Sequence, residues 1–148
     1  MEAGSSTVTL GLQLAAAAAM MLVTTLVHGL GLVGISKVLR LRSERLRRHD
    51  FDVRAVALMC SIALALLILH TIEIAIFAAF YIAVEAIYSL EEALYYSASA
   101  YATLGFTADY FPVEWRLVGA IEALIGFLMI GWSTAFIVAN VGELTPDD

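Results

Sequence analysis

The sequence is poor in cysteine, in charge, and in basic residues outside one short segment. Its only cysteine, Cys60, lies inside an apolar run, which excludes a framework of intrachain disulfides. Charged residues make up 15% of the chain, whereas soluble domains carry nearer a quarter. Seven of the eight basic residues share that one segment, so they are too few and too local for a nucleic-acid surface. These absences point away from a secreted disulfide-rich protein and from a nucleic-acid partner.

Apolar residues take the place of the missing charge. They make up 61% of the 148 residues, and the mean hydropathy is +0.89. Residues 8–35 contain no charged side chain, residues 55–84 contain only Glu73, and residues 117–141 contain only Glu122. Each stretch exceeds the ~20 residues that cross a hydrocarbon core. We therefore predict an all-α membrane protein with three transmembrane helices.

A secretory signal peptide is the alternative for the first apolar stretch. It would need a basic n-region, but the chain carries Glu2 there, and the apolar run is longer than the ~7–15 residues of an h-region. We favour an N-terminal transmembrane helix within residues 1–35.

The placement of basic residues predicts the orientation. Residues 36–54 form a segment with seven basic and three acidic side chains, namely Lys37, Arg40, Arg42, Arg45, Arg47, Arg48 and Arg54 against Glu44, Asp50 and Asp52. The positive-inside rule makes this segment a cytoplasmic loop. The N-terminus then lies outside, residues 85–114 are external, and residues 143–148 form a cytoplasmic tail. A helix lying on the membrane surface is a second possibility for the basic segment, but a solvated linker is the simpler one. We expect the plasma or inner membrane.

The external segment does not look like an ordinary loop. In "SLEEALYYSASA", Ser89 is followed three residues later by Glu92, which is the S-x-x-E capping box of a helix start. A short helix is predicted over residues 90–100, followed by the non-helical "TLGFT". Backbone that re-enters the membrane needs a protein-lined or water-filled surrounding. Three helices are too few to enclose a lumen, so several chains must do so together.

These residues resemble a known family. "YYSASAYATLGF" is similar to the pore helix and selectivity filter of the tetrameric potassium channels, whose filter reads T-V-G-Y-G-D. The resemblance implies a pore domain at 55–142, with an outer helix at 55–84, a pore helix at 90–100, a filter at 103–107 and an inner helix at 115–141. The first helix and the basic loop are additions to that plan.

The resemblance implies that backbone carbonyls of the filter replace the water shell of an ion. Thr103, Leu104, Gly105 and Phe106 match T-V-G-Y, while Thr107 stands where the second glycine belongs. A β-branched residue at positive φ is an outlier. We therefore expect the outermost carbonyl site to be lost or remodelled, and selection of K⁺ over Na⁺ to be weakened. Asp109 is expected at the outer mouth, where its charge attracts cations.

The function predicted is a homotetrameric, potassium-like cation channel that conducts passively. Its partners would be membrane lipid, its own copies and monovalent cations, K⁺ with Na⁺ as the alternative permeant ion, and no cofactor is expected. The alternative is a non-conducting channel homologue that acts as a subunit or membrane scaffold. An enzyme is not predicted, because no nucleophile–base constellation occurs.

Carboxylates inside membrane spans usually face the protein interior. Glu73 and Glu122 would either touch the permeation path or support the filter from behind, through bonds to Ser97, Ser99 or tyrosine hydroxyls. We favour support, because the resemblance implies carbonyls, not acids, at the ion.

Histidines and glycines complete the candidates. His70 and Glu73, at i and i+3, supply only two metal ligands, so no metal is expected beyond permeant monovalent cations. His28 and His49 are taken as incidental. Gly126 is either a gating hinge of the inner helix or a site of close packing. The tyrosines, all between residues 81 and 110, form either an interfacial belt or a packed cuff around the filter.

Overall fold

The computed structural model describes residues 3–45, 51–105 and 111–142, and the regular structure within them is entirely helical. The elements follow one another as α1 (Ala3–Arg45), α2 (Phe51–Ala83), α3 (Leu90–Tyr101), the short 3-10 helix η1 (Val113–Trp115) and α4 (Arg116–Gly142). Spans long and apolar enough to cross a membrane cover Leu10–Val38, Val56–Ala83 and Val113–Asn140. The predicted fold class, an all-α protein with three transmembrane helices, is confirmed.

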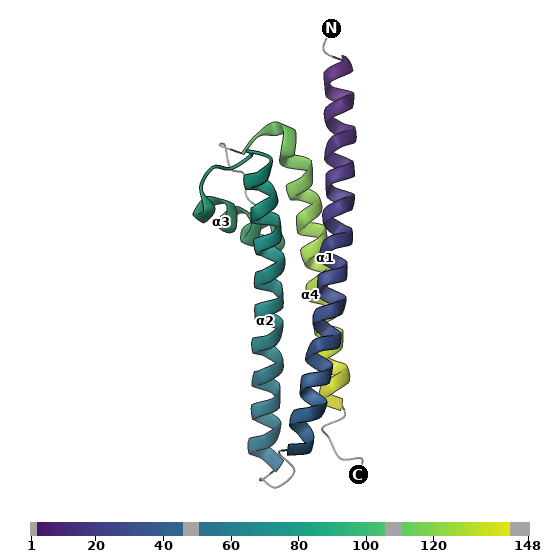
Figure 1. The fold of residues 1–148 in the computed structure, drawn as a ribbon, viewed down its shortest axis with the longest axis vertical. Coiled ribbons are helices and arrows are strands. Elements are labelled where there is room, and N and C mark those ends of the chain that lie inside the picture. The colour runs from purple at the N-terminus through teal and green to yellow at the C-terminus, as the bar shows by residue number, and fades with distance from the viewer. Residues whose placement is uncertain (1–2, 46–50, 106–110, 143–148) are drawn as a thin grey trace.

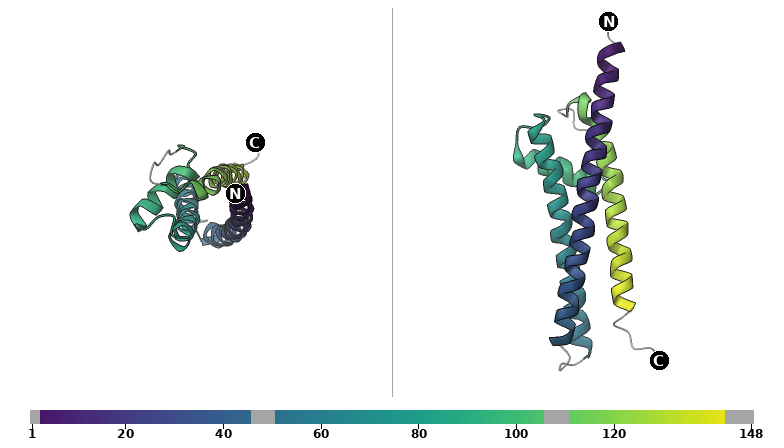
Figure 2. Two further views of the ribbon diagram at one scale, coloured as in Figure 1. Left: turned by 90° about the horizontal axis from the view of Figure 1, so that it is seen from above. Right: turned by 45° about the vertical axis from the view of Figure 1, so that its right-hand side comes forward.

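The three long helices form an antiparallel bundle, and α3 lies across one end of it (Figure 1). Helix α1 packs against both α2 and α4, while α3 packs between α2 and α4. The N-terminus lies at the end that carries α3, and the C-terminus lies at the other end (Figures 1 and 2). The short helix therefore enters and returns on one side, which is the arrangement of a re-entrant segment.

The basic segment differs from its prediction as a loop over residues 36–54. Helix α1 continues through Arg45 and α2 begins at Phe51, so residues 46–50 alone separate the two helices. The segment contains neither glycine nor proline, and leucine and arginine rank among the good helix formers. Nothing local stops the first helix where its apolar run ends.

Helix α3 begins as the capping pattern predicts. Ser89 has extended backbone, and its hydroxyl accepts a hydrogen bond from the backbone N–H of Glu92 at 3.5 Å. This contact satisfies one of the free donors at the start of the helix. The acidic side chains of Glu91 and Glu92 lie in the first turn, where the positive end of the helix dipole favours them.

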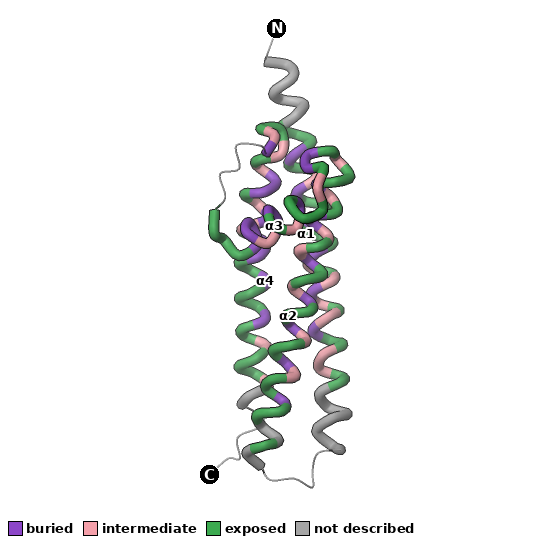
Figure 3. The backbone as a smooth tube through the Cα atoms, turned by 90° about the vertical axis from the view of Figure 1, so that its left-hand side faces the viewer, coloured by how far each residue is buried: buried purple, intermediate pink, exposed green. Residues whose placement is uncertain are grey.

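Buried side chains form two clusters along the bundle. The larger lies around α3 and includes Phe77, Tyr81, Tyr96 and Ile125, and the smaller lies between α1 and α2, around Leu32 and Leu66. Figure 3 shows buried residues concentrated where α3 meets the bundle and on the facing sides of the long helices. Most large apolar side chains elsewhere point outward, as expected of helices that face lipid or other copies of the chain.

Candidate functional site

The short helix α3 ends in a tight turn. The backbone N–H of Thr103 donates to the carbonyl of Ala100 at 2.9 Å, and the N–H of Leu104 donates to the carbonyl of Ser99 at 3.0 Å. This pair of bonds is a Schellman motif, which requires a left-handed residue after the helix. Thr103 takes that conformation with φ +59°, and Gly105 follows with φ +68°.

The left-handed threonine is unusual. Glycine reaches positive φ without steric cost, whereas a β-branched residue there is strained, at a cost of about 1–3 kcal/mol. The structure shows such a residue at Thr103. Thr103, Leu104 and Gly105 are all exposed on the single chain. The predicted filter residues Phe106 and Thr107 and the outer-mouth residue Asp109 lie outside the described residues.

Glu122 lies buried behind α3 and accepts hydrogen bonds at both carboxylate oxygens. Tyr81 of α2 donates to Oε2 at 2.6 Å, and Ser97 of α3 donates to Oε1 at 2.5 Å. The Ser97 hydroxyl also lies 2.9 Å from the carbonyl of Ile74. The carboxylate of Glu122 thus connects α2, α3 and α4 by side-chain contacts. These are the bonds that the supporting alternative required, and they keep this acid away from the exposed turn.

Glu73 is the centre of a second buried network, closer to the end of α3. Tyr101, the last residue of α3, donates to Oε2 of Glu73. The Nδ1 atom of His28 lies 2.8 Å from Oε1, and the Nδ1 atom of His70 lies 3.1 Å from Oε2. The side chains of His28 and Glu73 have no exposed surface, and that of His70 is 18% exposed.

The position of His28 corrects a prediction. We took His28 as incidental and counted only two ligands at the His70–Glu73 pair, yet α1 brings His28 into contact with Glu73 and places the centroid of its ring 5.5 Å from that of His70. The helix bounds observed in the structure explain the contact, whereas the predicted loop over residues 36–54 would have placed the two histidines at different depths. His28 lies 17 residues before the end of α1 and His70 lies 19 residues after the start of α2. In an antiparallel helix pair such positions face each other at the same depth.

Ser99 is buried on the same helix as Ser97, but its described contact is through the backbone, where its carbonyl accepts from Leu104. Ser99 therefore takes part in the turn that ends α3. All four residues proposed as filter support from the sequence are buried on α2, α3 or α4.

Glycines in α4 allow it to approach α3 closely. A Cβ atom built on Gly126 would lie 2.2 Å from the carbonyl oxygen of Tyr101, and one on Gly119 would lie 2.2 Å from the hydroxyl of Tyr96. A contact this short with backbone cannot be relieved by a side-chain rotation. Of the two alternatives for Gly126, hinge and close packing, the structure therefore supplies a direct reason for close packing.

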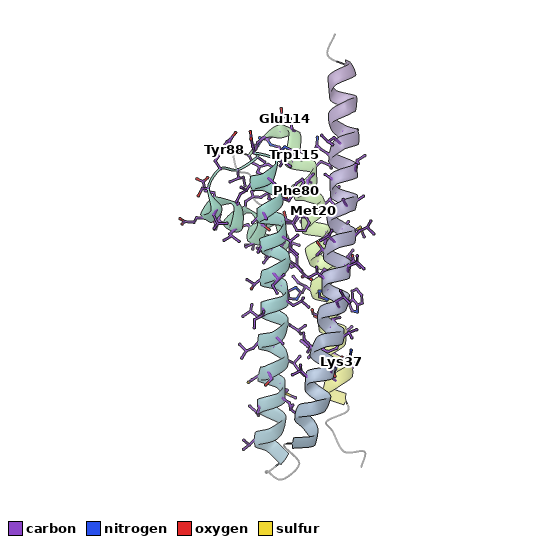
Figure 4. The ribbon with its side chains drawn as sticks, viewed as in Figure 1. Met20, Lys37, Phe80, Tyr88, Glu114 and Trp115 are labelled. Atoms are coloured by element: carbon purple, nitrogen blue, oxygen red, sulfur yellow. The ribbon has the colours of Figure 1, made fainter. Side chains whose placement is uncertain are left out.

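The tyrosines divide into two groups. Tyr81, Tyr96 and Tyr101 are buried, and the ring of Tyr96 stacks on Phe111 with centroids 4.0 Å apart. Tyr88 and Tyr95 are exposed, by 84% and 58% respectively. Phe80 of α2 and Trp115 of η1 meet edge to face with ring centroids 5.4 Å apart, and both pack against the buried cluster (Figure 4). The buried group forms an aromatic cuff around α3, and the exposed group is placed as a belt would be.

Comparisons with known proteins identify the same part of the chain. A family model described as "Ion channel" matches residues 67–143, which include the second half of α2 and all of α3, η1 and α4. Neither the curated proteins nor the solved structures contain a match to this chain. The matched part carries the re-entrant helix between two spanning helices, and the family points to ion transport rather than catalysis. The chain belongs to the ion channel family whose members share the two-helix potassium-channel pore, here preceded by an extra N-terminal transmembrane helix.

Proposed function

We propose that four copies of this chain assemble around the turn after α3 and conduct monovalent cations, K⁺ in preference to Na⁺, down their gradient. The observation that carries the proposal is the positive φ of Thr103 and Gly105 between two spanning helices. Alternation between left-handed and ordinary backbone is a way to turn successive carbonyls toward one axis. Carbonyls so aligned replace the hydration shell of a cation.

Exposure of the turn supports assembly. Leu104 is 75% exposed on the single chain, although it lies in a segment flanked by membrane-spanning helices. Non-helical backbone at membrane depth must be surrounded by protein or water. A ring of identical chains supplies both, because the turns of the copies would face one another around a wet axis.

Helix α3 contributes to ion binding through its direction. Its C-terminal end, at Tyr101, precedes the filter, and this end carries partial negative charge from unsatisfied carbonyls. A cation on the axis is favoured by that charge. The network of Glu73, Glu122 and Ser97, together with the turn contact of Ser99, would hold α3 in position from behind the filter.

Thr107 limits the filter in this proposal. With threonine in place of the second glycine, the carbonyls of residues 103–106 remain as ion sites and the outermost site is altered. Fewer consecutive sites weaken discrimination between K⁺ and Na⁺. Threonine at position 107 also favours the second candidate function, that of a non-conducting homologue that serves as a subunit or membrane scaffold.

The test is flux of K⁺, Na⁺ and Rb⁺ into liposomes that contain the purified protein. If the chain conducts, Thr107→Gly should raise K⁺ flux and sharpen K⁺ over Na⁺ selection, and Gly105→Ala should abolish flux because alanine is strained at φ +68°. Gly11→Ala is the matched control, since a Cβ there meets no atom within 4 Å. If both the wild type and the Thr107→Gly variant assemble as tetramers but carry no ion flux, the result would support the non-conducting scaffold instead.

A further inference from the structure

The network around Glu73 contains more ionisable and metal-ligating groups than are needed to hold the filter in place. Side chains from four helices meet around one buried point. They are two imidazoles, one carboxylate and two hydroxyls, which belong to His28, His70, Glu73, Tyr101 and Ser133. One ligand atom from each of His28, His70 and Glu73 lies within 4.8 Å of the other two. Two imidazole nitrogens and a carboxylate oxygen are the ligand set of many zinc sites.

Each imidazole faces the carboxylate with one nitrogen and Ser133 with the other. Both Nδ1 atoms face Glu73, at 2.8 and 3.1 Å. The Nε2 atoms of His28 and His70 lie 3.5 and 3.1 Å from the same Ser133 hydroxyl oxygen. Neutral imidazole carries one N–H and one lone pair, so a bond at one nitrogen decides the role of the other.

Without a cation, two neutral imidazoles compete for hydrogens in this arrangement. If both Nδ1 atoms donate to Glu73, both Nε2 lone pairs face Ser133, whose hydroxyl has a single hydrogen and can donate to only one of them. The other neutral arrangement has Nδ1 of His70 accept from the Tyr101 hydroxyl, which lies 2.9 Å away, and this takes the hydrogen that Tyr101 donates to Glu73.

A divalent cation removes the conflict. If both Nδ1 lone pairs bind the ion with Glu73, both Nε2–H groups donate to the two lone pairs of the Ser133 oxygen. Metal-bound histidines almost always donate their other N–H in this way. The Tyr101 hydroxyl, 2.9 Å from Nδ1 of His70, is placed as a fourth oxygen donor.

The contacts to Glu73 need little change, whereas the more distant of the ligand atoms, which lie within 4.8 Å of one another, would have to close toward the ion. Bonds of ~2.0–2.1 Å in a tetrahedral site place neighbouring ligand atoms about 3.3 Å apart. The nitrogen–oxygen contacts to Glu73 would open by a few tenths of an ångström to about half an ångström. The ion would bring one net positive charge beyond that of Glu73, and the end of α3 at Tyr101 offers partial negative charge beside it.

We propose that His28, His70 and Glu73, with Tyr101 as the fourth donor and Ser133 orienting both imidazoles, bind one first-row divalent transition metal ion such as Zn²⁺. Because His28 belongs to α1 and the other ligands belong to the pore domain, the ion fastens the extra helix to the channel. The site is separate from the exposed turn, so the proposal does not depend on conduction.

Metal content and spectroscopy of the full-length protein in detergent test the site. After treatment with a chelator, added Co²⁺ should bind at one ion per chain and produce the intense visible bands of four-coordinate Co²⁺, and Zn²⁺ should displace it. Zn²⁺, but not Mg²⁺, should raise the midpoint of thermal unfolding. Absence of the Co²⁺ bands from the folded wild-type protein would overturn the proposal without bearing on ion flux.

Variants separate a metal site from a network of hydrogen bonds. His28→Gln keeps a donor toward Glu73 but loses the imidazole, and Zn²⁺ affinity should fall more than about 100-fold. Ser133→Ala should lower affinity by about 10–100-fold, as loss of an orienting partner does elsewhere. His49→Gln removes the remaining histidine of the chain and should change nothing. Equal Zn²⁺ affinity in H28Q and H49Q would contradict the assignment.

Discussion

Individual residues in this protein act mainly through close contacts behind the exposed turn. Glu122 has both carboxylate oxygens occupied by hydroxyls from other helices, and Gly126 leaves room for the backbone of Tyr101. Neither residue lies on the exposed turn. Replacement of either residue should therefore lower the stability of the protein, and any loss of ion flux should follow from that loss of stability.

Replacement of Glu122 by leucine should destabilise the protein. Leucine offers no acceptor, so the buried hydroxyl of Tyr81 loses its partner, whereas Ser97 can still donate to the carbonyl of Ile74. The expected loss is about 1–3 kcal/mol, measured as a lower midpoint of thermal unfolding in detergent. Glu114→Leu, at an exposed position of η1, is the control and should leave the midpoint unchanged. Equal midpoints for the two variants would refute a structural role for Glu122.

Replacement of Gly126 by alanine should push α4 away from the end of α3. The added Cβ would lie 2.2 Å from a backbone oxygen, and overpacking of this kind typically costs about 1–3 kcal/mol. Because Tyr101 directly precedes the turn, ion flux should fall together with the unfolding midpoint. Gly131→Ala, on the same helix with no atom within 4 Å of the new Cβ, serves for comparison. A G126A protein of wild-type stability and flux would favour the hinge interpretation.

At the scale of elements, two helices end in the same way without the usual glycine. Helix α2 closes with bonds from Glu85 N–H to the Ile82 carbonyl at 3.0 Å and from Ala86 N–H to the Tyr81 carbonyl at 2.9 Å, with Glu85 at φ +56°. Helix α3 closes likewise through Thr103. Each motif reverses the chain sharply, and together they place α3 beside α2.

Glu85→Gly should therefore stabilise the end of α2. A left-handed residue other than glycine costs about 1–2 kcal/mol, of which the greater freedom of glycine in the unfolded chain offsets about 0.5–1 kcal/mol. We expect the free energy of unfolding, measured by thermal denaturation, to rise by about 0.5–1 kcal/mol. Glu91→Gly, in the helical first turn of α3, should do the opposite and lose about 1 kcal/mol. Changes of the same sign in both variants would contradict the assignment of the left-handed turn.

At the scale of the whole molecule, the main feature is that the two ends of the bundle carry different charges. The end with α3 carries the exposed acidic residues Glu91 and Glu114, whereas Lys37 lies toward the other end (Figure 4). The positive-inside rule predicts that the Lys37 end is cytoplasmic. The extra helix α1 runs the length of the bundle and contacts α2, α4 and η1, so it is built into the pore domain and not merely attached to it.

The orientation can be tested by cysteine labelling of intact cells in a Cys60→Ser background. A membrane-impermeant thiol reagent should modify Tyr88→Cys directly, since that position is 84% exposed and lies at the end with α3. Lys37→Cys should be modified only after the membrane is permeabilised, and six basic residues of the segment remain to maintain orientation. Labelling of the cysteine at position 37 in intact cells would show that the chain has the opposite orientation.

Much of the fold follows from local properties of the sequence. Three apolar stretches of membrane length, one basic segment and the Ser89 cap were sufficient to predict the three spans and the short helix between them. Each of these signals acts within a few turns of one helix, so no neighbouring helix is needed to interpret it. The bonds from hydroxyls to Glu122 also followed from the rule that carboxylates in a membrane span face protein.

The sequence by itself therefore determined which segments cross the membrane, where the chain re-enters and which acids are buried. Only the tertiary structure decided that His28 meets Glu73, that the left-handed strain falls on Thr103, and that Gly126 contacts the end of α3. The physical reason is that faces toward lipid and toward protein are both apolar in these helices, so hydropathy does not specify how each helix is rotated. Rotation and depth, which bring residues 45 positions apart within hydrogen-bonding distance, arise from the packing of the helices against one another.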